Sequence, residues 1–88
     1  MSQRVVYRYD PVALAGANLG IDVEASGERF AATLRGALER EFPAATIEVV
    51  RGRSGVELEG FDDPPTATLR VEGLARAVRT ATDWIVYR

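Results

Sequence analysis

"GIDVEASGERFAATLRGAL", residues 20–38, changes its hydrophobic spacing halfway along. In its first third, apolar residues alternate with acidic ones, which is the spacing of a half-buried strand. The apolar positions there are Ile21, Val23 and Ala25. From Phe30 onward the apolar residues recur three or four positions apart, which is typical of an amphipathic helix. We therefore expect a strand over residues 19–25 that leads directly into a helix.

The boundaries of this helix follow from its flanking residues. Ser26 is the expected N-cap, because its hydroxyl can accept a hydrogen bond from an N–H group that the first turn leaves unpaired. The helix should end near Phe42, since Pro43 cannot continue it. Gly36 inside the helix costs about 1 kcal/mol relative to alanine, so we expect a close helix contact at this position to offset the cost.

Short strands are expected on either side of this unit. Residues 4–9, "RVVYRY", predict one strand, after which Asp10 and Pro11 suit the N-cap and first position of a single helical turn, with a plain loop as the alternative. Residues 45–51 and 56–60 each carry alternating apolar and acidic side chains and are joined by the turn "GRSG". This pattern predicts a β-hairpin.

The last third of the chain predicts a long amphipathic helix. Asp63 is its expected N-cap, with Pro64 and Pro65 in the first turn. Its apolar residues recur at steps of three and four and form one continuous stripe. They are Ala67, Val71, Leu74, Val78, Ala81 and Ile85. Two alternatives stay open: a strand at "TLRVE" with the helix starting at Gly73, or a terminal strand at "WIVYR".

The element order predicts one α+β domain over residues 1–88, with a βαββα core over 19–88 and an extra N-terminal strand or arm over 1–18. A helix separates the first core strand from the second, so the third strand is expected between them, antiparallel to both. Both helices should then pack on one face of this small antiparallel sheet. A ferredoxin-like plait, completed by the terminal strand, is the alternative.

The composition indicates a non-catalytic protein. The 88 residues include no cysteine, no histidine and no lysine, and all 11 basic residues are arginine. Because thiolate, imidazole and amine groups are missing, we expect no enzyme and no cofactor. The N-terminus lacks an apolar signal core and no apolar run approaches the roughly 18 residues of a membrane span, which predicts a cytoplasmic protein. The net charge of −2 argues against direct nucleic-acid binding.

The solvent face of the predicted sheet is acidic. Its carboxylates are Asp22, Glu24, Glu48, Glu57 and Glu59. Such a face repels itself, so we expect the segment with Arg4 and Arg8 to compensate it, paired along the edge of the sheet or exchanged with a second copy. The spacing does not match an Asp-x-Asp-x-Asp-Gly calcium loop, and we interpret the face as solvated and free of metal.

The long C-terminal stripe is the main indication of function. It is longer than one small sheet can bury, so part of it should pack on a second copy of the chain or on a different protein. The expected contact residues are Leu74, Arg76, Val78, Arg79, Ala81, Trp84 and Ile85. Trp84 is expected in core or edge packing, but if it were exposed it would be a strong anchor for a protein partner.

Three stretches together resemble a known family. "IDVEASGERFAATLRGAL", "TIEVVRGRSGVELEGFDD" and "LRVEGLARAVRTATDWI" are similar to the strand–helix unit, the hairpin with its aspartate, and the last helix of the small dimerising subunit of the KEOPS complex. That complex makes the threonylcarbamoyl modification of tRNA adenosine. The resemblance implies a non-catalytic subunit that forms homodimers and packs its helix against a sugar-kinase-like catalytic subunit.

Two other functions remain open at this point. One is an unrelated small α+β interaction module, such as a phage-encoded inhibitor or an accessory subunit. The other is a small ligand-binding domain that uses the acidic sheet face.

Overall fold

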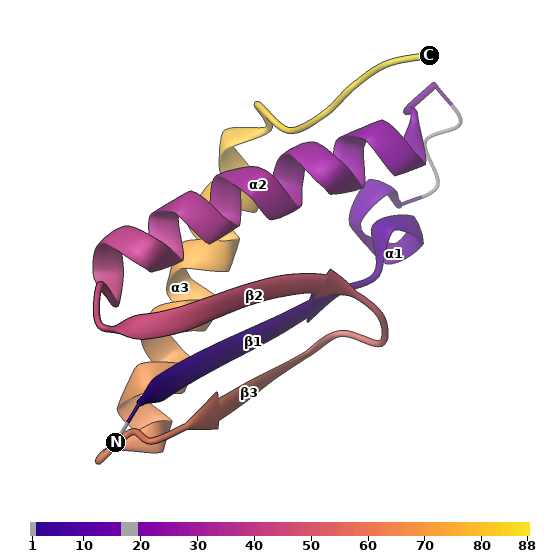
Figure 1. Ribbon diagram of the computed structural model, residues 1–88. Helices are drawn as coiled ribbons and strands as arrows, with labels where there is room; N and C mark the ends of the chain where they lie inside the picture. Colours follow the sequence, from indigo (N-terminus) through magenta and orange to yellow (C-terminus); the bar gives the residue numbers. More distant parts are fainter. Residues whose placement is uncertain (1, 17–19) are drawn as a thin grey trace.

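The computed structural model describes residues 2–16 and 20–88, which form a small α+β domain, as predicted (Figure 1). Met1 and residues 17–19 lie outside this description, and with them the first residue of the predicted strand 19–25 and part of the predicted arm 1–18. The elements in chain order are β1 (Gln3–Tyr9), α1 (Pro11–Ala15), α2 (Val23–Glu41), β2 (Ala45–Arg51), β3 (Gly55–Glu59) and α3 (Pro64–Ala81).

The three strands pair in the order β2-β1-β3, with β1 parallel to β2 and antiparallel to β3. The predicted hairpin is therefore wrong, because β1 lies between β2 and β3, and the sheet is mixed rather than antiparallel. The physical reason is burial: Val5 and Val6 point to opposite faces of β1 and both are buried, which suits a central strand. The turn after β2 passes over the end of β1, where the Gly52 N–H donates to the Tyr9 carbonyl at 3.0 Å.

The prediction of a strand over residues 19–25 is wrong. Asp22 is the N-cap of α2 and its Oδ1 accepts from the Ala25 N–H at 3.1 Å, so the helix begins at Val23. Ile21 keeps only an isolated antiparallel bridge to Tyr87. The alternating pattern misled because Val23, seven residues before Phe30, also lies on the helical face that Phe30 occupies, so it fits both spacings.

Ser26 is not the N-cap of α2 but a buried residue of its first turns, 1% exposed. The next residue, Gly27, marks a close approach: a Cβ there would lie 3.1 Å from both Pro11 Cβ and Tyr9 Cε2. No such contact exists at Gly36, where the nearest atom to a Cβ would be Arg40 Nη1 at 3.9 Å. The expected close helix contact at Gly36 is therefore wrong.

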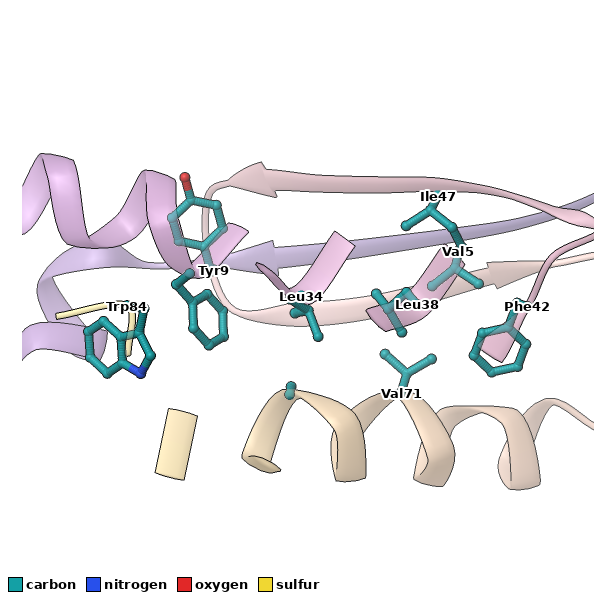
Figure 2. Close-up of a cluster of buried hydrophobic side chains, with 10 residues drawn as sticks. Val5, Tyr9, Leu34, Leu38, Phe42, Ile47, Val71 and Trp84 are labelled. Carbon is teal, nitrogen blue, oxygen red and sulfur yellow. The ribbon is translucent and has the colours of Figure 1, made fainter. Parts of the chain in front are cut away.

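The two long helices pack on one face of the sheet, as predicted (Figure 1). Figure 2 shows the core between the sheet and α3, and its most deeply buried apolar side chains are Val5, Phe30, Leu34, Leu38 and Val71. At one end of this core the ring centroids of Phe30 and Trp84 lie 5.9 Å apart. At the other end the ring centroids of Phe42 and Phe61 lie 5.6 Å apart. Both are edge-to-face contacts, and together they show that α2 and α3 run in opposite directions.

Both predicted aspartate caps are confirmed. Asp63 accepts from the Thr66 N–H at 3.3 Å, with Pro64 opening α3, and Asp10 accepts from the Val12 N–H at 3.0 Å, so the segment that follows Asp10 is a helical turn. Proline suits a first helical position because its missing N–H would be unpaired there in any case.

The helix α3 is continuous through Gly73, so the alternative strand at 68–72 is not formed. It ends earlier than predicted, at Ala81, because Thr82 takes a left-handed conformation with φ 60°. Trp84 and Ile85 therefore lie beyond the helix. The last residues add no strand to the described sheet, since Tyr87 forms only the bridge to Ile21, and the ferredoxin-like alternative is wrong.

Candidate functional site

The open face of the sheet is neutralised by Arg4 and Arg8, as predicted, but from the central strand of the same chain rather than from an edge or a second copy. Arg4 in the central strand pairs with Glu48 on β2 and with Glu59 on β3, and Arg8 pairs with Glu57 at 2.8 Å. The hydrogen bond from Arg8 holds the pKa of Glu57 below its ordinary value. These ion pairs leave few carboxylates on the face free to bind a ligand.

Two of the five carboxylates predicted on this face lie elsewhere. Asp22 caps α2, and Glu24, in the first turn of that helix, pairs with Arg51 at 2.6 Å. Both were misplaced because residues 23–25 are helical rather than extended. Within residues 2–16 and 20–88, no three acidic side chains are grouped closely enough to hold a metal ion.

An apolar groove runs between α2 and α3 on the side away from the sheet, and we call it the helix groove. It has a volume of about 250 Å³ and is lined by Ala37, Leu74, Ala77, Val78, Ala81 and Trp84, with Thr33 and Asp83 at its margin. The side chains of Leu74 and Val78 are half-buried, whereas Ala77 and Ala81 are exposed. The groove is thus a shallow apolar surface that a single chain leaves partly open to solvent.

The two ends of the helix groove carry different charges. Beyond Leu74, Arg70 Nη2 binds Glu41 Oε1 at 2.8 Å and bridges the two helices. At the Trp84 end, Asp83 is exposed and makes no ion pair within the described residues. Arg40 lies about one helical turn after Ala37, which lines the groove on α2. It is exposed and makes no ion pair within the described residues.

Four of the seven residues predicted to bind a partner line the helix groove, namely Leu74, Val78, Ala81 and Trp84. Trp84 is only 5% exposed and its Nε1 donates to the Arg79 carbonyl at 3.0 Å, so it is a core residue rather than an exposed anchor. Ile85 packs half-buried against the core.

Arg76 and Arg79 lie apart from these four, on the opposite side of α3. They face a second hollow, which we call the β1 pocket, with a volume of about 380 Å³. This pocket lies where β1 ends, between α1 and α3, and Tyr7, Tyr9 and Phe30 contribute aromatic rings to it. Burial raises the pKa of Tyr7, while the nearby Arg79 guanidinium opposes that rise.

The tyrosines of the β1 pocket are not among the site residues predicted from the sequence. Tyr7 and Tyr9 were assigned to an extra N-terminal strand, and nothing in that assignment brings them near α3. A central position for β1 would have placed both rings on the helix-covered face, because they share its side of the strand with the buried Val5.

Among residues 2–16 and 20–88, no helix is both long enough and apolar enough to cross a membrane. Comparison of the chain with protein-family models, with curated proteins and with solved structures found no match.

Proposed function

We propose that this chain is a non-catalytic interaction subunit of the cytoplasm that forms a homodimer through its helix groove. The observation that carries the proposal is the partly exposed apolar lining contributed by both long helices, with Ala77 and Ala81 open to solvent. Small side chains along such a groove allow a second pair of helices to approach closely. A contact made by the same surface on both copies is also the commonest way for a soluble chain to self-associate.

The charges beside the groove favour a second copy as its occupant. Because α2 and α3 are antiparallel, Arg40 lies toward one end of the groove and Asp83 toward the other. A two-fold axis through the middle of the groove exchanges its ends, and so brings Arg40 of each copy toward Asp83 of the other. Neither side chain has an ion-pair partner within the described part of its own chain, so both are available for this contact.

Sedimentation equilibrium of single-charge variants tests this role. Ala77→Glu places a carboxylate in the apolar groove at an exposed helix position, and we expect it to weaken dimer formation at least about tenfold, because the buried charge would have no partner. Ala32→Glu makes the same change on the solvent face of α2 and is the matched control. A chain that sediments as a monomer at all concentrations, with or without Ala77→Glu, would contradict the proposal.

Membership of the threonylcarbamoyl-tRNA complex is the more specific form of this proposal. Its support is the similarity of "LRVEGLARAVRTATDWI" to the family's last helix, together with the strand, helix, strand, strand, helix order from β1 to α3. In this order β1 takes the place of the strand expected over residues 19–25, and the short α1 is added. A pull-down with a sugar-kinase-like catalytic subunit tests it separately from dimerisation. Leu69 of α3 is 70% exposed and lies outside the helix groove. Retention that Leu69→Glu abolishes supports membership, and no retention of a folded dimer contradicts it.

A further inference from the structure

The β1 pocket is a second concave surface that the proposed dimer does not use. It lies across α3 from the helix groove, since Arg76 and Arg79 face it while Leu74 and Ala77 face the groove. It opens at the C-terminal end of β1, beside Ser54 of the turn that follows β2. Its volume of about 380 Å³ falls within the range of small-molecule sites.

The floor of the β1 pocket is aromatic. Phe30 is 1% exposed. The ring centroids of Tyr7 and Tyr9 lie 6.4 and 6.1 Å from that of Phe30, and both rings are tilted relative to it. Ala75 of α3 closes the floor on the other side and is also buried. Phe30 and Ala75 are therefore covered, and the apolar surface that a ligand can reach belongs to the half-buried Tyr7 and Leu14. Such a surface favours a flat apolar group over a fully polar ligand.

The rim of the β1 pocket is charged. Arg76 and Arg79 are exposed, and their guanidinium groups make no ion pair or hydrogen bond within residues 2–16 and 20–88. Guanidinium groups suit a carboxylate, which they can bind through two parallel hydrogen bonds. Glu72 and Asp10 also lie at the rim, so the four charges cancel and a multiply charged anion gains less there than a singly charged one.

We propose that the β1 pocket binds a small monocarboxylate with a flat apolar body, the ring lying against Tyr7 and Leu14 and the carboxylate facing Arg76 and Arg79. This site is independent of the dimer, because none of these residues lines the helix groove.

Binding of indole-3-acetate to the full chain, followed by NMR shifts of backbone amides and by calorimetry, tests this site. We expect a dissociation constant below about 1 mM with shifts at Tyr7, Ser54 and Ala75, and binding of the neutral indole-3-acetamide weaker by about tenfold or more. Equal binding of acid and amide would overturn the proposal, as would binding of inorganic phosphate in place of the acid, or no binding to the folded chain.

Variants of the rim test the assigned roles. The double change Arg76→Gln and Arg79→Gln should weaken indole-3-acetate binding by about tenfold or more, whereas Glu72→Gln should tighten it, because a like charge is removed. Arg29→Gln, an exposed arginine on α2, is the matched control and should change nothing. The rim variants should leave sedimentation unchanged, so failure here and failure of the dimer are distinguishable. Unaltered affinity in both rim variants would overturn the proposal.

Discussion

Ser26 and Val86 bind each other through two hydrogen bonds. The Ser26 Oγ donates to the Val86 carbonyl at 3.2 Å and accepts from the Val86 N–H at 2.8 Å. Ser26 is the one buried polar residue among residues 2–16 and 20–88. Its hydroxyl pairs with both backbone groups of Val86, as a neighbouring strand would. The segment after α3 is thereby held against the start of α2, next to the Asp22 N–H, which donates to the same carbonyl at 2.7 Å.

We expect Ser26→Ala to lower the free energy of unfolding by about 1–3 kcal/mol, because the half-buried Val86 N–H loses its acceptor while the Val86 carbonyl keeps only the Asp22 N–H. Hydrogen exchange of the Val86 amide should become faster at the same time. Ser54→Ala, at an exposed turn position, is the matched control and should stay within about 0.5 kcal/mol of the parent chain. An unchanged exchange rate at Val86 would show that the serine does not hold this segment.

Asp22 rather than Ser26 should behave as the helix cap. Asp22→Ala removes the acceptor for the Ala25 N–H and should cost about 0.5–2 kcal/mol in urea unfolding. Asp22→Asn keeps an acceptor at the same place and should be close to neutral. Equal stability of the alanine and asparagine variants would contradict this assignment.

Two glycines of α2 should respond in opposite ways to alanine. Gly36→Ala should stabilise the fold by about 0.5–1 kcal/mol, because alanine favours the helix and the position is open. Gly27→Ala should instead destabilise it by about 1–3 kcal/mol, since its Cβ would meet the constrained rings of Pro11 and Tyr9. Thermal unfolding of the two variants side by side checks this, and a more stable Gly27→Ala would refute the close packing of α1 on α2.

Stability should fall in alkali because of the buried phenols. Burial raises the pKa of Tyr7 and Tyr9 above the ordinary value of 10.0, so the folded state favours their neutral forms. This contribution is complete below about pH 10 and is lost as the pH rises through the raised folded pKa. The chain has no lysine or cysteine to titrate in the same range.

Urea unfolding between about pH 8 and pH 12 measures this loss. The double change Tyr7→Phe and Tyr9→Phe should flatten the alkaline fall. Tyr87→Phe, which removes a hydroxyl from a side chain that is 68% exposed, is the matched control. An equally steep fall in the double variant would mean that the two phenols are not responsible.

Much of the local structure was predictable from short-range chemistry. Asp10 and Asp63 were recognised as caps because each precedes a proline and a helical pattern, and the caps need nothing from the rest of the chain. The pairing of Arg4 and Arg8 with glutamates was predictable because strand alternation places these carboxylates together on one face of the sheet. The caps depend only on neighbours in sequence, whereas the partners of Arg4 and Arg8 lie on other strands.

The strand order was not predictable in the same way. A hairpin and two strands that flank a third have the same local pattern, and what separates them is which strand is buried on both faces. Val6 shows that β1 is buried on both faces. It lies on the open face of the sheet, between Glu48 of β2 and Glu57 of β3, and its side chain is only 7% exposed. The valine pair at the centre of β1 was the available signal for a central strand.

Only the α3 wall of the helix groove was predictable from the sequence, because the other wall depends on tertiary packing. The stripe through Leu74, Val78 and Ala81 gave one wall of the helix groove, but Ala37 on the other wall is brought there only by the packing of α2 on α3. Arg76 lies two residues from both Leu74 and Val78 and so about 200° around the helix from each, which already separates it from the stripe. Helical geometry applied residue by residue would have assigned the arginines to another surface.

Sedimentation equilibrium on charge-exchanged variants is the most direct test of the dimer through the helix groove. Arg40→Glu alone and Asp83→Arg alone should each weaken the dimer, because each places like charges opposite one another across the two-fold axis. The double variant should recover most of the lost affinity, since the pair is then restored with exchanged signs. A dimer equally strong in all four chains, or a monomer in all four, would contradict the account.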